Sequence, residues 1–293
     1  MRHARAEIAN LEHLSFKQTE KHYMLCNTFK QIALNTWDTI AESRRANFQL
    51  KEETFTDINM LDLKLRHSGQ VRTTVFSKPV EGRNGADWEW WFNLNNNQWI
   101  GFRVQAKILN ITSEEFEHLH YQTPATGIYQ CDKLIQNALT RTHPKIPLYC
   151  FYLQTDNPAR LTNWSCGSFT PTRDLWGCSL MSAFEVKRLR AANQKHLSHV
   201  ENLMKPWHCL VCCSGYGGGE SKIFNIGEYA KNNFSLDKDS ISDLDVNIPD
   251  SFITQKPPSY VLAILESENA KDVQPPDKEL DGIMIYTFKE EQK

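Results

Sequence analysis

The sequence has little net charge, no long apolar run and no internal repeat. Its 33 Lys and Arg residues nearly balance 35 Asp and Glu residues in a chain of 293, leaving a formal charge of −2. No overall field therefore draws the protein to nucleic acid or membrane, and a polyanion site must be a local patch. Apolar stretches such as residues 146–153 are too short to cross a bilayer, and the charged first 17 residues lack the apolar region of a signal peptide. We expect a cytoplasmic protein with no membrane partner.

Cysteine is scattered rather than arranged in a framework. Of the eight cysteines, Cys26, Cys131 and Cys150 stand in partly apolar surroundings. This usage is typical of buried thiols in a reducing compartment. Residues 208–213 contain a Cys-x-x-Cys pattern, but they read as an apolar strand, which would not turn both thiolates toward one ion. Whether Cys209, Cys212 and Cys213 bind zinc stays open at this point.

The spacing of apolar residues predicts an α/β protein with a mixed central sheet. Residues 27–45 have one apolar helical face, and a second helix is expected from a Thr-x-x-Asp cap at Thr54, with Phe55, Ile58, Leu61 and Leu65 turned to the core. The elements expected next are strands at 71–77, 86–94 and 99–109, a short helix at 113–120, a helix at 128–140 and a buried strand at 146–153. Later elements are expected to be a helix at 184–204 and strands at 206–213, 260–265 and 282–288. The predicted organisation is a helical N-terminal extension (1–48), a core with its elaborations (49–215) and a C-terminal extension with two strands and long acidic loops (216–293).

The hairpin of residues 86–109 carries polar side chains inside apolar strands. Side chains alternate between the two faces of a strand, so Asp87 and Glu89 share one face, and Gln105 and Lys107 share one face of the partner strand. The short connection makes it plausible that both pairs lie on the same side of the sheet. Polar groups in such strands are costly unless they are satisfied or used.

These residue types suit metal-assisted hydrolysis of a phosphodiester. Asp87, Gln105, the carbonyl of Ala106 and a carboxylate from a neighbouring helix offer hard oxygen ligands for Mg²⁺ or Mn²⁺. The ammonium of Lys107 could orient or deprotonate a metal-bound water and offset charge on the phosphate. The alternative is an ordinary cross-strand ion pair of Asp87 and Lys107 on a solvated face.

A helix bearing Glu52 and Glu53 is followed by Asp87 and then by Gln105-Ala106-Lys107. This pattern resembles the PD-(D/E)XK restriction-endonuclease-like nuclease superfamily. It is most similar to the branch that writes the last motif as Gln-x-Lys, and the fuller pattern looks like a poorly characterised bacterial family. The resemblance implies an α-β-β-β-α-β core over about residues 50–155, with Asp87 and Gln105 at the metal and Lys107 acting on water. It also implies Glu53 at the helical acidic position. Ala86-Asp87 stands where the family has Pro-Asp, and Gln105 replaces an acid.

For several candidate site residues, more than one role is open. Glu52 or Asp57 could replace Glu53 as the helical acid, and Glu89 is as easily a structural carboxylate as a metal ligand. Lys78, Arg83 and Arg103 lie near the motif in sequence and could meet phosphates. Gln130 on the following helix could touch the site or the phosphate backbone, or lie on an ordinary helix surface.

The expected function is an Mg²⁺- or Mn²⁺-dependent endonuclease acting on DNA, with RNA as an open second substrate. Cutting both strands of a duplex favours a homodimer or larger assembly. A role in defence against foreign DNA follows from the resemblance alone, and a regulatory partner is unknown. The alternatives are a catalytically inactive nucleic-acid or protein binding module on the same fold, and a zinc-stabilised interaction protein.

Overall fold

The computed structural model describes most of the chain. The described residues are 25–76, 88–94, 97–140, 142–157, 161, 172–212, 226–234, 241–267, 273 and 280–287.

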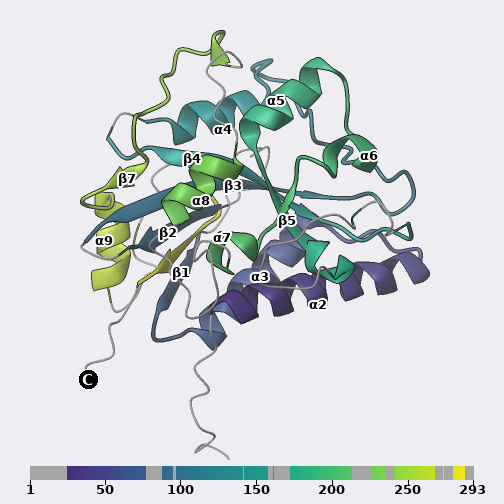
Figure 1. Cartoon of the computed structure of the whole chain (residues 1–293), viewed down its shortest axis with the longest axis horizontal. Coiled ribbons are helices and arrows are strands. Elements are labelled where there is room, and N and C mark those ends of the chain that lie inside the picture. Colours follow the sequence, from purple (N-terminus) through teal and green to yellow (C-terminus); the bar gives the residue numbers. More distant parts are fainter. Residues whose placement is uncertain are drawn as a thin grey trace, which may run out of the picture.

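Helices and strands are mixed along the described chain, and the last strand comes close to its end (Figure 1). The helices are α2 (Leu25–Arg45), α3 (Glu52–Arg66), α4 (Gln130–Ala138), α5 (Ala183–Ala191), α6 (Leu197–Val200), α7 (Cys209–Cys212), α8 (Ile226–Asn233) and α9 (Ser259–Glu266), with the 3-10 helix η2 (Arg173–Gly177). The strands are β1 (Val71–Val75), β2 (Trp88–Asn93), β3 (Trp99–Ile108), β4 (Lys145–Tyr152), β5 (Cys178–Ser182), β6 (Lys205–Pro206), β7 (Ile253–Thr254) and β8 (Gly282–Tyr286).

The strands form one mixed sheet in the order β1-β8-β2-β3-β4-β5-β6, with β7 pairing the start of β3. β2 and β3 are the predicted antiparallel hairpin, in which Trp88 pairs with Val104. β4 lies parallel to β3 on its other side. β8, from the end of the chain, lies between β1 and β2, antiparallel to the first and parallel to the second. The expectation of a mixed α/β sheet is confirmed.

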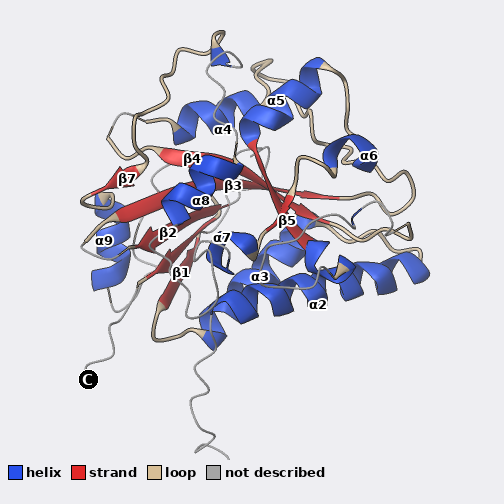
Figure 2. Cartoon of the chain, in the orientation of Figure 1, coloured by secondary structure: helices blue, strands red, loops and turns tan. Residues whose placement is uncertain are grey.

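Helices cover both faces of the sheet, as Figure 2 shows most clearly for α2 and α3 on one side and α4 and α5 on the other. A buried apolar cluster joins α2, α3, α7 and α8 to one face of the sheet. A second cluster lies under α4 and α5, and a third joins α9 to β2 and β8. Each central strand is thus buried on both sides, which matches their nearly continuous apolar sequences.

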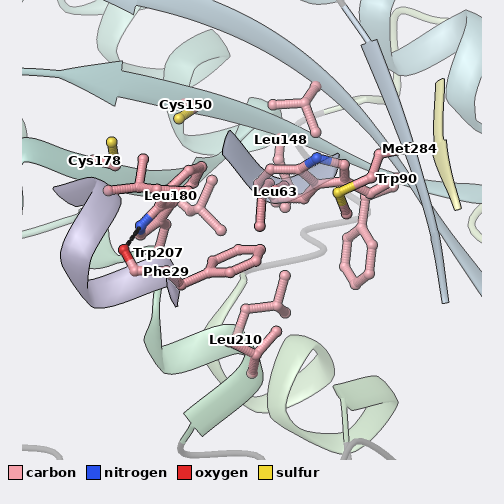
Figure 3. Packing of buried hydrophobic residues seen from close by; sticks show 14 of the residues in the cluster. Phe29, Leu63, Trp90, Leu148, Cys150, Cys178, Leu180, Trp207, Leu210 and Met284 are labelled. Carbon is pink, nitrogen blue, oxygen red and sulfur yellow. Dashed lines mark hydrogen bonds between the residues drawn. The ribbon is translucent and has the colours of Figure 1, made fainter. Parts of the chain in front are cut away.

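Aromatic rings fill the core between α2 and the sheet (Figure 3). Phe29 of α2 lies 4.6 Å from the Trp207 ring and 5.9 Å from the Trp90 ring, measured between centroids. The indole of Trp207 donates a hydrogen bond of 2.7 Å to the Phe29 carbonyl, so this large side chain is buried without leaving its N–H unpaired. The tryptophans of β2, Trp88, Trp90 and Trp91, are all buried.

Several local expectations were wrong. The segments 206–213 and 260–265, predicted as strands, contain helices α7 and α9, and the predicted helix 113–120 is a series of turns. The predicted helix 184–204 is two helices, α5 and α6. Helix α3 begins at Glu52 rather than at Thr54, with Lys51 at the N-cap position.

The expectation that all cysteines are free thiols was also wrong. Cys26 of α2 and Cys212 of α7 form a disulfide between residues 186 positions apart. Cys131, Cys150, Cys178 and Cys209 are free and buried, and burial raises the pKa of the Cys131 thiol to about 12. Burial also raises the pKa of the Cys178 thiol, so Cys131 and Cys178 are thiols rather than thiolates at neutral pH.

The three predicted segments share one sheet and one core. Helix α2, in the predicted N-terminal extension, packs in the same cluster as the strands. Strand β8, in the predicted C-terminal extension, is an interior strand of the sheet. The boundaries at 48/49 and 215/216 therefore do not separate structural layers.

Gly177, at the end of η2, allows that helix to approach α2 closely. A Cβ atom at this position would lie 2.7 Å from the backbone nitrogen of Trp37 and would also overlap the carbonyl of Ala33. Both atoms belong to the backbone of α2, so neither can move aside as a side chain does.

We predict that Gly177→Ala lowers the free energy of unfolding by at least about 2 kcal/mol, because the methyl group forces α2 away from the sheet. Gly69→Ala is the matched control, since a Cβ there would meet nothing within 4 Å. Urea denaturation of both variants measures the difference. Equal stability of the two variants would contradict the close packing of α2 on η2.

Candidate functional site

Strand β3 carries three polar side chains on one face. Val104 and Ala106 turn into the cluster below α2 and α3, so Arg103, Gln105 and Lys107 turn to the opposite face. All three are buried, at 2%, 1% and 4% exposure respectively. Charged and amide groups inside a protein need partners, so the contacts of these three side chains decide what the strand can do.

Arg103 has a structural partner in Glu89 of β2. The carboxylate of Glu89 lies 3.3 Å from Arg103 Nη1 and 3.5 Å from Lys145 Nζ. It also accepts hydrogen bonds from the Trp91 indole at 2.9 Å and from the Tyr260 hydroxyl of α9 at 2.6 Å. Burial, with the adjacent Glu89 charge, raises the pKa of Tyr260 and keeps its hydroxyl protonated as a donor.

This buried network corrects two predicted roles. Arg103 was expected to contact phosphate, but its side chain is inside the sheet and committed to Glu89. Glu89 was a candidate metal ligand, but it is fully buried and surrounded by four donors. The structure thus favours the alternative that Glu89 is a structural carboxylate.

Lys107 pairs with an acid from helix α3. Its Nζ lies 3.5 Å from Oε1 of Glu52, the first residue of that helix. The lysine side chain is 4% exposed, whereas Glu52 is 23% exposed. The pair therefore joins a buried cation to a carboxylate that is partly exposed to solvent.

The loop between α2 and α3 places Glu52 beside the end of β3. The Gln49 side chain accepts a hydrogen bond of 2.9 Å from the backbone N–H of Ile111, three residues beyond the strand. Arg44 of α2 donates to the Ile111 carbonyl and, at 2.7 Å, to the Gln154 side chain that follows β4. Helix α3 therefore starts at the same end of the sheet as Lys107.

Burial and neighbouring charges shift the pKa of the Glu52 carboxyl in opposite directions. Burial raises its pKa above the ordinary value, and the neighbouring Glu53 charge acts in the same direction. Lys107 and, less strongly, His118 lower it. A second positive charge at this position would favour the carboxylate in the same way, because cations stabilise the ionised form.

Of the two acids at the start of α3, Glu52 is the one that contacts Lys107. Glu53, the residue predicted from the resemblance, is exposed on the outside of α3, while Glu52 makes the contact with Lys107. Adjacent residues on a helix point about 100° apart, so only one of the two can face the strand. Glu52 lies one turn before the buried Thr56, whereas Glu53 lies one turn before the exposed Asp57.

Gln105 and Ala106 immediately precede Lys107 in the sequence, and both are buried. The Gln105 side-chain amide donates to the Ala106 carbonyl at 3.3 Å, so both predicted oxygen donors belong to one local group. Gln130, the first residue of α4, is also buried, which rules out the ordinary helix-surface position considered for it. Because β3 and β4 are parallel, α4 runs back between them and begins at the end where β3 finishes.

Three predicted residues lie outside the described residues: the metal ligand Asp87 and the phosphate contacts Lys78 and Arg83. Asp87 immediately precedes Trp88, the first residue of β2. Its role remains a prediction from the sequence.

The oxygen donors near the end of β3 are of the type that a hard divalent cation prefers. Glu52, the Gln105 side chain and the Ala106 carbonyl are oxygen ligands of the kind that Mg²⁺ and Mn²⁺ accept, with waters completing the shell. Within the described ranges, no group of three or more His, Cys, Asp or Glu residues is placed to hold a metal. A metal site at the end of β3 therefore stays a prediction.

The cysteines near residue 210 are arranged differently from a zinc site. Cys212 is bonded to Cys26, and Cys209 lies in the core with its Sγ 3.8 Å from His208 Nε2. Cys213 lies outside the described residues. The arrangement gives no support to zinc binding by this group.

A family model matches residues 25–292, almost all of the chain. The chain belongs to the DUF6615 family. Its description is a family of unknown function, so membership assigns no activity. No curated protein and no solved structure matches the chain. In the described part of this family member, no helix is long and apolar enough to span a membrane.

Sequence reasoning missed His118. This exposed residue lies in the turns after β3, close enough to act on the charge of Glu52. It lies in the segment 113–120, which was predicted as a short helix, and no motif singled it out. The only available signal was its place shortly after the Gln-x-Lys strand.

We predict that Glu89→Gln lowers the free energy of unfolding by about 3–5 kcal/mol, because it removes the carboxylate shared by Arg103 and Lys145 inside the sheet. Tyr260→Phe removes one hydrogen bond to the same carboxylate, and we expect a loss of about 1.5–3 kcal/mol. Urea denaturation gives both values. A smaller loss for Glu89→Gln than for Tyr260→Phe would contradict the central place of Glu89.

Proposed function

We propose that this protein is a divalent-metal-dependent nuclease, with DNA as the substrate and endonucleolytic cleavage as the reaction. The observation that carries the proposal is the contact between Glu52 and Lys107 at the end of β3, with Gln105 on the same face. A buried lysine beside a solvent-accessible carboxylate and an amide is a set of groups that phosphodiester hydrolysis uses.

The chain order of elements supports the proposal. Helix α3, strands β1, β2 and β3, helix α4 and strand β4 follow one another as in the predicted α-β-β-β-α-β core. In this sheet β8 separates β1 from β2, so the assignment to the PD-(D/E)XK superfamily rests on the motif and the element order.

Each residue has a proposed task. Glu52, Gln105 and the Ala106 carbonyl, together with Asp87, would hold Mg²⁺ or Mn²⁺, which when bound polarises the phosphoryl oxygen and acidifies a water. As an ammonium ion, Lys107 would orient that water and offset the charge that grows on the phosphate oxygens. Water forms a bond to phosphorus, the bond to the leaving oxygen breaks, and that oxygen takes up a proton. Glu52 would also hold the Lys107 side chain in place.

The same proposal includes the cellular location and biological role of the activity. A cytoplasmic enzyme that acts on foreign DNA would agree with the family resemblance, and a regulatory partner would restrain it. RNA is the second substrate to be tested.

The alternative function is an inactive binding module for nucleic acid or protein on the same fold. Gln105 in place of an acid favours this alternative, because it removes one negative charge from the metal site.

Plasmid cleavage in Mg²⁺ tests the proposal. We predict that the wild-type protein cuts the plasmid, that EDTA stops the reaction, and that Lys107→Ala or Glu52→Gln lowers the rate by about 10²-fold or more. Glu53→Gln, a change of the adjacent exposed acid, is the matched control and should keep the wild-type rate. Asp87→Asn tests the ligand predicted from sequence.

Three outcomes decide between the functions. Cleavage that Glu52→Gln abolishes and Glu53→Gln leaves unchanged supports the nuclease. An intact plasmid whose migration on a gel is shifted equally by wild type and variants favours the binding module. Cleavage that persists in Lys107→Ala rules out this site as the catalytic centre.

A further inference from the structure

Helix α3 has an apolar stripe on the side that faces away from the core. Ile58, Leu61 and Leu65 are 56%, 55% and 68% exposed. The sequence predicted these three side chains to be buried together with Phe55. Phe55 is buried as predicted, but its buried apolar neighbours on α3 are Met60 and Leu63. We call Ile58, Leu61 and Leu65 the α3 stripe. Their spacing of three and then four residues is the spacing of helices that pair along their length.

The polar contacts of α3 explain why the stripe faces outward. Thr56 and Asn59 lie on the buried face, where the Thr56 hydroxyl is 3.1 Å from the Tyr152 hydroxyl and Asn59 Nδ2 is 3.7 Å from Cys178 Sγ. These partners satisfy the two polar side chains inside the protein. The orientation of the helix is thus set, and three large apolar side chains are left on the surface, where such a patch marks an interaction site.

Charged residues beside the α3 stripe identify its partner. Asp57 and Lys64, seven residues apart, are both exposed on one flank of the stripe. Asp62 lies on the other flank and is paired with Arg66 of its own helix at 2.6 Å. The flank of Asp57 and Lys64 therefore carries one charge of each sign at the two ends of the stripe.

A second copy of α3 complements this pattern in one direction only. In an antiparallel pair related by a two-fold axis near Leu61, Asp57 of one copy lies opposite Lys64 of the other, and the symmetry repeats the contact. In a parallel pair, Asp57 would instead lie near Asp62 of the second copy, which brings like charges together. The stripe itself is nearly symmetric about Leu61, so both halves bury apolar side chains.

We propose that the α3 stripe is the contact surface of a homodimer in which two α3 helices pair antiparallel. A single pair of helices of this length buries less area than a standard stable interface. The dimer is therefore expected to form reversibly with rising protein concentration. The proposal does not depend on the nuclease activity, and its test uses no activity measurement.

Sedimentation velocity of the full chain over a range up to about 100 μM tests the dimer, whose mass is twice the 33.9 kDa of the monomer. Asp57→Lys and Lys64→Asp should each raise the dissociation constant about tenfold, because each change places like charges together twice. The double variant Asp57→Lys/Lys64→Asp restores opposite charges and should return the dissociation constant to within about threefold of wild type. This rescue is specific to a partner that carries the same helix.

Two further variants separate loss of the surface from loss of the fold. Leu61→Glu should abolish the dimer, whereas Leu262→Glu, on an exposed position of α9, should not change it. Unchanged thermal unfolding of the monomer shows that the variants remain folded. The proposal is overturned if the wild-type protein is a monomer throughout the concentration range. The stripe would then contact another partner or residues 1–24. A double variant no better than its single changes also overturns the proposal.

Discussion

A strand buried on both faces must satisfy every polar side chain that it carries, and β3 carries three. Arg103, Gln105 and Lys107 are nearly inaccessible to solvent, yet two of them are cations. Leaving a cation unpaired inside a protein costs several kcal/mol, so each must meet an opposite charge. The positions of Glu89 and Glu52 follow from this requirement.

The two ion pairs along β3 differ in what they permit. At the middle of the strand, Glu89 is closed in by Arg103, Lys145, Trp91 and Tyr260, so this pair joins β2, β4 and α9 to the centre of the sheet. At the end of the strand, Glu52 comes from a helix and keeps part of its surface open. Pairing in the middle of β3 thus supports the fold, while pairing at its end leaves a carboxylate that is partly exposed to solvent.

Sequence reasoning succeeded where one signal dominated. The alternation of polar and apolar residues over 99–109 predicted the strand and the face of each side chain, and the apolar run at 146–153 predicted the buried strand β4. Sequence reasoning failed where one sequence pattern is compatible with two kinds of secondary structure. Residues 260–265 are apolar throughout, and a short apolar run is compatible with a strand or a helix, here α9.

The remaining errors have long-range causes. Helix α3 has apolar residues on two sides, and the choice between them depends on Tyr152 and Cys178, which lie about a hundred residues further along the chain. The insertion of β8 between β1 and β2 likewise depends on pairing across the whole sequence. For the site, the sequence limited the helical acid to a few neighbouring residues, and the orientation of α3 distinguishes Glu52 from Glu53.

The central claim is that Glu52 and the end of β3 form one metal-binding site. Titration of the protein with Mn²⁺, followed by the electron paramagnetic resonance signal of the free ion, tests it without any substrate. The account predicts that Glu52→Gln weakens Mn²⁺ binding by about tenfold or more, while Glu53→Gln binds like the wild type. Equal affinity of wild type and Glu52→Gln would contradict the account.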